Sequence, residues 1–199
     1  MKGFKLAGAL AGAFLFASSA YAAPGDMLVR VRAVDIDFQN SVSTPALAGV
    51  AAANKVIPEV DLSYFFTENI ATELILTYPQ KINVDPNVGS LKALPPTLTV
   101  QYHFMPDNPS FRPYVGIGVN YTNFSSVSLA GGALNSSNSS TGGALQVGFD
   151  VPLSGNMSFN FDVKKVYMKT TVSSAASGAT VGTLTLNPYL IGAGLGWKF

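Results

Sequence analysis

The sequence predicts an all-β fold, an eight-stranded antiparallel up-and-down β-barrel that spans a membrane. Three observations support this prediction: eight segments of alternating apolar and polar residues, connections that are alternately short and long, and high apolarity without a long apolar run. Hydrophobic residues make up 48% of the chain and charged residues only 12%. A spanning helix needs about 18 or more consecutive apolar residues, so an apolar chain lacking such a run after its N-terminus points to a closed barrel.

Residues 1–22 have the pattern of a secretory signal peptide. Lys2 and Lys5 precede a short apolar stretch, and Ala20-Tyr21-Ala22 places small residues at the two positions that a signal peptidase reads. We expect cleavage after Ala22, which leaves residues 23–199 as a single barrel domain. Without the two lysines the charge balance is slightly acidic, and we therefore expect no nucleic-acid partner. The chain has no cysteine, so disulfides and thiolate metal sites are excluded.

The alternation defines eight predicted strands and the connections between them. The strands are Met27–Ile36, Val56–Phe66, Ile70–Tyr78, Thr97–Phe104, Phe111–Phe124, Ala144–Val151, Met157–Met168 and Leu184–Phe199. Residues 67–69, 105–110 and 154–156 are short turns, whereas 37–55, 79–96, 125–143 and 169–183 are long loops rich in Ser, Gly, Ala, Asn and Pro. Short turns at one end and long loops at the other are typical of outer-membrane barrels.

The last predicted strand shows which face of each strand meets lipid. One face carries Tyr189, Ile191, Ala193, Leu195, Trp197 and Phe199, and the other carries Leu190, Gly192, Gly194, Gly196 and Lys198. Successive side chains of a strand point to opposite faces, so the first set suits lipid and the second a crowded interior. A soluble barrel would place its large apolar residues inside. Here the charged residues lie on the inward face, which favours a membrane barrel.

With the short turns taken as periplasmic, the inward residues fall into two levels according to their depth along the strands. The lower lumen is predicted to be a polar floor, in which opposite charges pair because an unpaired ion in a low-dielectric core is costly. The floor residues are Arg30, Arg32, Asp61, Glu73, His103, Asp150, Asp162 and Lys198. The upper lumen is predicted to be an apolar, channel-lining cup formed by Val34, Ile36, Ile57, Ile75, Phe124, Val166, Met168 and Leu190.

The cup has two interpretations that the sequence leaves open. It is either a binding and transport path or the core filling of a small barrel, whose interior is only about wide enough for side chains or one small ligand. Pro58, Pro188 and Pro95-Pro96 lie near the extracellular strand ends and remove ladder donors. They either leave the wall locally unpaired, which would allow sideways exit, or simply end strands at the rim.

No catalytic, cofactor or metal site is predicted. His103 is the only histidine, and it lies beside a short, periplasmic turn, far from the outer mouth where membrane-barrel enzymes place their base or nucleophile. We expect His103 to be satisfied inside the lumen, with a floor carboxylate as one available partner. The chain is therefore not expected to be an enzyme.

Two features of the outer surface suggest contacts with the membrane and the mouth. Lys165 has the outward phase, and a lipid-facing lysine costs about 2–4 kcal/mol at the bilayer centre but almost nothing near an interface. We place it at the outer rim beside lipopolysaccharide phosphates, either at a specific site or as an ordinary snorkelling lysine. The apolar stretch Pro45–Ala53 either folds over the mouth as a lid or shelters against the rim.

Several segments share a characteristic order and spacing along the chain after the signal peptide. They are residues 25–33 (GDMLVRVRA), 69–74 (NIATEL), 94–98 (LPPTL), 112–118 (RPYVGIG), 162–165 (DVKK) and 187–199, from Asn187-Pro188 through GWKF. Taken together, these segments resemble the OmpW family of small eight-stranded outer-membrane barrels, which includes alkane-uptake porins, and their combination is more specific than any one piece.

The resemblance implies a monomeric barrel in the outer membrane of a Gram-negative bacterium. It also implies a narrow apolar channel that passes small hydrophobic molecules sideways into the membrane. The terminal Phe199 matches the signal that the barrel-assembly machinery reads in such proteins. The leading hypothesis is thus passive uptake of a small hydrophobic substrate. The alternative is a structural or recognition barrel whose loops serve adhesion, phage docking or bacteriocin docking.

Overall fold

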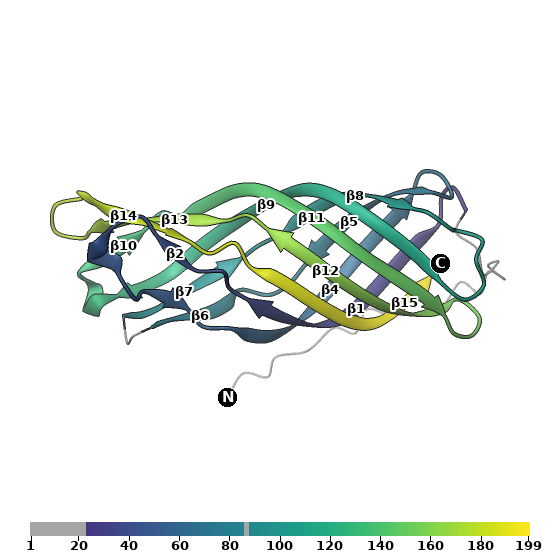
Figure 1. The fold of residues 1–199 in the computed structure, drawn as a ribbon, viewed down its shortest axis with the longest axis horizontal. Coiled ribbons are helices and arrows are strands. Elements are labelled where there is room, and N and C mark those ends of the chain that lie inside the picture. The colour runs from purple at the N-terminus through teal and green to yellow at the C-terminus, as the bar shows by residue number, and fades with distance from the viewer. Residues whose placement is uncertain (1–22, 86–87) are drawn as a thin grey trace, which may run out of the picture.

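The computed structural model describes residues 23–85 and 88–199 and shows a closed antiparallel β-barrel (Figure 1). Each wall strand pairs with its neighbour in chain order, and the last pairs back with the first. The eight wall strands are β1 (Met27–Asp37), β4 (Lys55–Phe65), β5 (Ile70–Leu76), β8 (Thr97–His103), β9 (Arg112–Leu129), β11 (Ser139–Pro152), β12 (Met157–Val166) and β15 (Tyr189–Lys198). The predicted fold class is confirmed.

The two ends of the barrel differ as the connection lengths predict. The turns after β4, β8 and β11 lie at one end together with the C-terminus, on the right of Figure 1, and the long connections lie at the other. Within the described part of the chain, no helix is long and apolar enough to cross a membrane. The predicted signal peptide, residues 1–22, falls outside the described residues.

The long connections, predicted to be loops, contain additional β-strands. Segment 79–96 forms a hairpin of β6 (Gln80–Asp85) and β7 (Gly89–Leu94), and segment 169–183 contains most of a second hairpin, β13 (Lys169–Ser174) and β14 (Thr180–Thr185). The prediction of loops there was wrong, because strands this short show too few alternations to stand out among turn residues. The remaining elements are β2 (Ser41–Val42), β3 (Ala51–Ala52), β10 (Leu134–Ser136) and the 3₁₀ turns η1 (Pro45–Leu47) and η2 (Ala130–Gly132).

Several predicted strand ends also need correction. The last predicted strand, Leu184–Phe199, is two elements, because β14 ends at Thr185 and β15 begins only at Tyr189. Between them Asn187 has a φ of +31° and Pro188 has no N–H to donate, so the chain bends and the ladder is interrupted. At the extracellular end β9 continues past the predicted Phe124, and β11 begins at Ser139 rather than Ala144.

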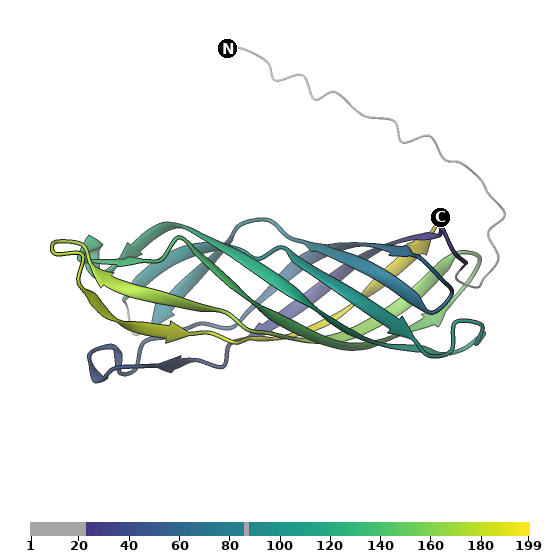
Figure 2. The ribbon, with the colours of Figure 1, turned by 90° about the horizontal axis from the view of Figure 1, so that it is seen from above.

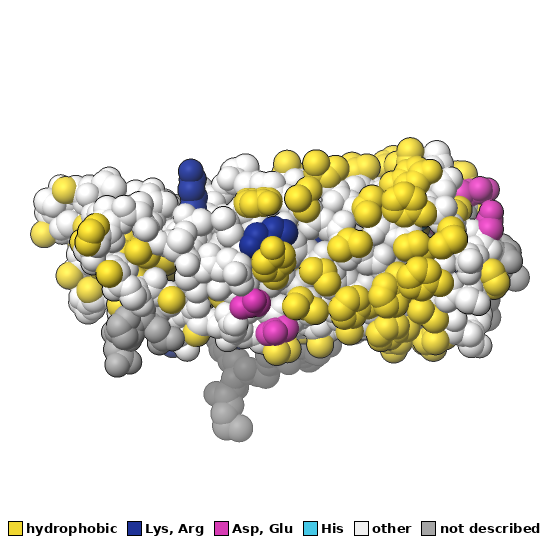
Figure 3. All heavy atoms as spheres, in the orientation of Figure 1, with side chains coloured by type: hydrophobic (Ala, Val, Ile, Leu, Met, Phe, Trp, Pro, Cys, Tyr) yellow, Lys and Arg dark blue, Asp and Glu magenta, His cyan; other side chains and the backbone are white. Residues whose placement is uncertain are grey.

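The outer surface of the barrel has a broad apolar band (Figure 3). Its side chains are outward residues of the wall strands, such as Ile117, which is 66% exposed. Aromatic residues border the band at both ends, as in other membrane barrels. The periplasmic border includes Phe66, Phe104, Phe111 and Phe199, and the extracellular border includes Tyr78, Tyr121, Tyr167 and Tyr189. We call the latter set the tyrosine border.

Outward lysines lie close to or beyond the tyrosine border. Lys165 Nζ lies 3.8 Å from the centre of the Tyr189 ring and donates to Asn187 O over 2.7 Å. Lys81 and Lys92 are exposed and face each other in register across the β6–β7 hairpin. The outward phase predicted for Lys165 therefore places it at the rim, where its charge can reach lipid headgroups.

The apolar stretch Pro45–Ala53 is part of the rim and extends along the side of the barrel (Figure 2). β2 pairs with β14 and β3 pairs with β6, so the segment links two neighbouring parts of the wall. Leu47 packs into the apolar core and is only 2% exposed. Of the two alternatives left by the sequence, the structure favours shelter against the rim.

Candidate functional site

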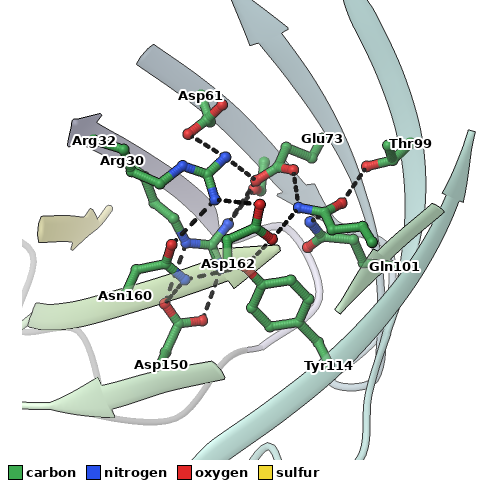
Figure 4. Close-up of polar contacts among 12 residues, drawn as sticks. Arg30, Arg32, Asp61, Glu73, Thr99, Gln101, Tyr114, Asp150, Asn160 and Asp162 are labelled. Atoms are coloured by element: carbon green, nitrogen blue, oxygen red, sulfur yellow. Dashed lines mark hydrogen bonds and ion pairs between the residues drawn. The ribbon is translucent and has the colours of Figure 1, made fainter. Parts of the chain in front are cut away.

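Two inward arginines of β1 organise the polar floor (Figure 4). Arg30 reaches Glu73 Oε1 through Nη1 at 2.9 Å and Asp150 Oδ2 through Nη2 at 2.7 Å. Arg32 Nη2 lies 2.6 Å from Asp61 Oδ2. Because residues two apart in a strand share a face, β1 presents both guanidinium groups to the lumen. The two arginines therefore tie β1 to β4, β5 and β11.

An ion pair between Lys164 and Glu59 lies at the upper limit of this network. Lys164 Nζ lies 3.2 Å from Glu59 Oε1 and 2.9 Å from Asp162 Oδ1. Glu59 Oε1 also lies 3.0 Å from Arg32 Nη2. All four side chains are almost fully buried. Charges removed from water need several partners each, and the shared contacts supply them.

Neutral side chains complete the floor. Tyr114 donates from its hydroxyl to Asp162 Oδ2 over 3.0 Å, and Gln146 donates to Glu73 Oε2 over 2.8 Å and to Asp162 Oδ2 over 2.7 Å. Position 148 is glycine because a Cβ there would lie 2.5 Å from the Tyr114 hydroxyl oxygen. An eight-stranded barrel has an interior about one side chain wide, so these packed groups close the lower lumen.

A cavity opens directly above the ion pair of Lys164 and Glu59. Its open space is only about 40 Å³. Its wall is mostly apolar, and it includes Phe38 from just beyond β1. Of the predicted cup residues, those that line it are Ile36, Ile57, Ile75, Val166, Met168 and Leu190. Side chains thus nearly fill the cup in this conformation.

The other two predicted cup residues belong to a larger apolar cluster. Val34 and Phe124 are buried in it without lining the cavity. The cluster continues through Leu91, Leu129 and Leu184 of the extracellular strands. The apolar interior therefore extends from the charged floor towards the extracellular end of the barrel.

Six predicted floor residues lie in one network, namely Arg30, Arg32, Asp61, Glu73, Asp150 and Asp162. His103 and Lys198 lie below it, beside a periplasmic pocket. His103 Nε2 is hydrogen-bonded to Gln101 Oε1 at 3.1 Å, an amide oxygen rather than a carboxylate oxygen. Lys198 pairs with Asp26 at 3.0 Å. Lys198 is thus separate from the centre of the floor, whereas His103 is linked to it through Gln101, which donates to Gln146 Oε1 over 3.2 Å.

Sequence reasoning missed Glu59, Lys164 and Tyr114. The alternation could have found the first two, because Glu59 shares the phase of Asp61 and Lys164 shares that of Asp162. Tyr114 is fully buried, although an aromatic residue near a strand end is usually expected in an interfacial border. Only its phase within β9 distinguishes it from the exposed Phe111.

The wall beside the cavity lacks regular pairing in two places. The β4–β5 ladder ends at Val60 and Leu76, and beyond it Thr77 Oγ1 donates to Pro58 O over 3.1 Å. On the other side, the β1–β15 ladder ends at Asp37 and Tyr189, and the sheet resumes only where β14 meets β2. Thr77 and Pro188 both line the cavity. These two gaps are thus next to the apolar cup.

Comparisons with known proteins identify close similarity along the whole described chain. Residues 23–199 match the model of the OmpW family. The uncharacterized outer-membrane protein y4mB of Sinorhizobium fredii is 40% identical over 181 residues, which cover 86% of this chain and 79% of that protein. Outer membrane protein W of Vibrio cholerae is 32% identical over 216 residues, covering 99% and 97%. The crystal structure of OprG from Pseudomonas aeruginosa has a TM-score of 0.77 at 25% identity and covers 92% of this chain and 99% of that one.

Proposed function

The chain belongs to the OmpW family of outer-membrane proteins of Gram-negative bacteria, and from this premise we propose that it is a passive channel for small hydrophobic molecules. The observation that carries the proposal is the apolar cavity seated directly on a closed, charged floor. An apolar molecule gains by leaving water for such a cavity, by about 0.8 kcal/mol for each buried CH₂. The same molecule has no favourable route through the ion pairs below.

Because the floor is closed, the molecule leaves sideways into the outer membrane. The gaps beside Thr77 and Pro188 support this route, since fewer backbone hydrogen bonds hold the wall together there than in the regular ladders. Transfer from the cup into lipid exchanges one apolar environment for another. The overall direction therefore follows the concentration of the molecule and needs no energy source.

Side chains must move before the cup can hold a ligand. An apolar cavity that binds benzene has a volume of about 150 Å³, well above the open space of about 40 Å³ in the cup. Met168 lines the cavity and has a flexible, unbranched side chain that repacks easily. We propose that Met168 and Phe38 move aside as the ligand enters, and that the cup refills when the ligand leaves.

Uptake of n-octane by cells with and without the protein tests the channel. The initial rate is measured by gas chromatography of washed cells, with outer-membrane integrity checked by exclusion of a large dye. We expect faster uptake by cells that contain the barrel. Equal rates in both cell types, at matched envelope integrity, would overturn the proposal.

The extracellular strands favour a second candidate function. The β6–β7 and β13–β14 hairpins extend the barrel at the end away from the C-terminus (Figure 1), and the stretch 170–188 contains no charged residue. Such a surface suits a recognition barrel used in adhesion or in phage or bacteriocin docking. Removing residues 175–178 at the tip of the β13–β14 hairpin would abolish docking of the phage or bacteriocin and leave octane uptake unchanged. Unchanged docking by this variant would argue against recognition through that tip.

We further propose that the barrel-assembly machinery inserts the protein as a monomer and that it contacts lipopolysaccharide in the outer leaflet. Lys165 and Lys169 support the lipid contact, because both face outwards beside the tyrosine border. A lysine near an anionic membrane surface contributes about 1 kcal/mol to the attraction. Pairing with lipid phosphates is therefore favourable at this position.

A further inference from the structure

One oxygen in the apolar cup has no partner. Gln80, the first residue of β6, lines the cavity and is only 2% exposed. Its Oε1 is a buried acceptor without a hydrogen bond. Leaving a polar atom unpaired inside a protein costs about 1–3 kcal/mol, so the retention of an amide here calls for an explanation.

The orientation of the Gln80 amide is set by its neighbours. Its Nε2 donates to Tyr78 O over 3.0 Å, and it also lies 3.4 Å from Thr77 Oγ1. A backbone carbonyl oxygen can only accept, so the nitrogen must face Tyr78. The oxygen is consequently the atom left without a partner, and turning the amide over would lose the Tyr78 bond.

The other polar groups of the cup are already engaged. Asn120 donates to Thr97 Oγ1 over 2.8 Å, and its Oδ1 accepts from Thr122. Glu59 and Lys164 pair with each other at the base. Among the described residues that line the cavity, Gln80 alone has a buried side-chain nitrogen or oxygen without a hydrogen bond. A donor brought in by the ligand therefore has this one unpaired side-chain acceptor available among the described lining residues.

We propose that the cup selects small apolar molecules that carry one hydrogen-bond donor, a hydroxyl or N–H group, which donates to Gln80 Oε1. The hydrocarbon part packs lower in the cup against Ile57, Ile75, Val166 and Leu190. Gln80 follows Tyr78 of the tyrosine border, so the polar end of the ligand lies at headgroup depth and the chain at acyl depth. An amphiphile in the outer leaflet has the same orientation, and exit beside Thr77 needs no inversion.

This inference rests on the proposed channel function and narrows its substrate class. A pure hydrocarbon gains the same apolar contacts but leaves Gln80 Oε1 unpaired. An ether of the same composition has an acceptor but no donor, so it also leaves that oxygen unpaired. One net hydrogen bond changes an equilibrium by about threefold to tenfold, and we expect discrimination of that size.

The experiment compares the barrel-dependent initial uptake of 1-octanol with that of its isomer 1-methoxyheptane, and uses n-octane as the reference probe. Cells without the protein give the background that is subtracted for each probe. The variant is Gln80→Met, which keeps the length of the side chain and removes the acceptor. Gln39→Met is the matched control, because Gln39 is exposed and does not line the cavity. Gln80→Glu retains an acceptor at the same position.

We expect the octanol-to-ether ratio to fall about threefold to tenfold in Gln80→Met and to remain at the wild-type value in Gln39→Met. Gln80→Glu should retain more of the discrimination than Gln80→Met. A ratio within each strain is insensitive to expression level. If octane uptake depends on the barrel but the ratio is the same in wild type and Gln80→Met, the inference is wrong and the channel stands. If no probe shows barrel-dependent uptake, the channel itself is refuted.

Discussion

Lys164 Nζ lies 3.2 Å from Glu59 Oε1, and this ion pair separates the apolar cup from the charged floor. Both side chains line the base of the cavity, and each also contacts the network below through Asp162 or Arg32. The boundary between the two levels is therefore made by charges that satisfy one another. A ligand in the cup meets a neutral pair rather than a single ion.

The first prediction is that this pair couples strongly in folding. We expect Lys164→Met to lower the free energy of unfolding by about 3 kcal/mol, because Glu59 and Asp162 each lose a buried partner. The double variant Glu59→Leu/Lys164→Met should lose less free energy of unfolding than the two single variants lose in total. We expect this difference, the coupling energy, to be about 1 kcal/mol or more. Urea unfolding of the barrel in lipid vesicles measures all three variants.

Lys165→Met is the control for that cycle. Lys165 is the next residue but faces outwards, so its loss removes no buried pair. Additive effects of Glu59→Leu and Lys164→Met would show that the two residues do not act as a pair.

The second prediction concerns the cup as the transport path. Val166→Arg or Met168→Arg places a long cation in the apolar cavity, and we expect octane uptake to fall to the level of cells without the protein. The barrel should still assemble, as judged by its heat-modifiable mobility on gels, because a long arginine can extend its charged end towards water. Tyr167→Arg is the control, since Tyr167 lies between them and faces lipid at the border. Wild-type uptake by both cup variants would place the path elsewhere.

The sequence could predict which of these side chains line the cup and which face lipid, because alternation along a strand has a period of two. Val166 and Tyr167 point to opposite sides for that reason alone, and lipid keeps the outward side apolar. Met168 keeps the inward phase although β12 ends at Val166. The same reasoning, applied to every residue of a strand, would have included Glu59 and Lys164.

Other features could not be predicted from local pattern. Arg30 pairs with Asp150 across the lumen, and the choice of that carboxylate depends on the register of strands far apart in the sequence. The hydrogen bond from Gln80 Nε2 to Thr77 Oγ1 depends on the gap in the wall pairing at Thr77, and the alternation of residues does not predict that gap. Short strands such as β6 gain their order from pairing with β3 and β7 rather than from their own residues.

The third prediction is that the floor is the barrier to ions. Arg30 joins Glu73 and Asp150, and Arg30→Ala leaves both carboxylates without that partner and opens space where the guanidinium lay. We expect higher single-channel conductance in planar bilayers and a free energy of unfolding lower by about 3–5 kcal/mol. Lys198→Ala should leave the conductance near that of wild type, because Lys198 lies below the central network beside Asp26. Equal conductance of wild type and Arg30→Ala would mean that another constriction limits ion flow.

The fourth prediction tests the proposed lipid contact. Lys165→Gln and Lys169→Gln each remove one positive charge at the tyrosine border, and the affinity for lipopolysaccharide in nanodiscs should fall about fivefold for each. The effect should shrink at high salt, since exposed charges are screened. Lys198→Gln, at the periplasmic end, is the control. If the double variant binds lipopolysaccharide as tightly as wild type, the contact does not involve these lysines.

The fifth prediction concerns how the segment 37–55 is held at the rim. Asn40 Nδ2 donates to Ala52 O over 3.0 Å, and Ala52 N donates to Asn40 Oδ1 over 2.8 Å, so the side chain acts as a short strand partner. In Asn40→Ala the backbone of Ala52 loses both bonds, which together contribute about 1–3 kcal/mol. We expect faster amide exchange at Ala52 and faster proteolysis within 43–50, with little change in the unfolding of the barrel. Gln39→Ala, which removes only an exposed bond to Asp37, should leave both rates unchanged. Exchange at Ala52 that is as slow in Asn40→Ala as in wild type would show that pairing with β6 and β14 holds the segment in place without the Asn40 side chain.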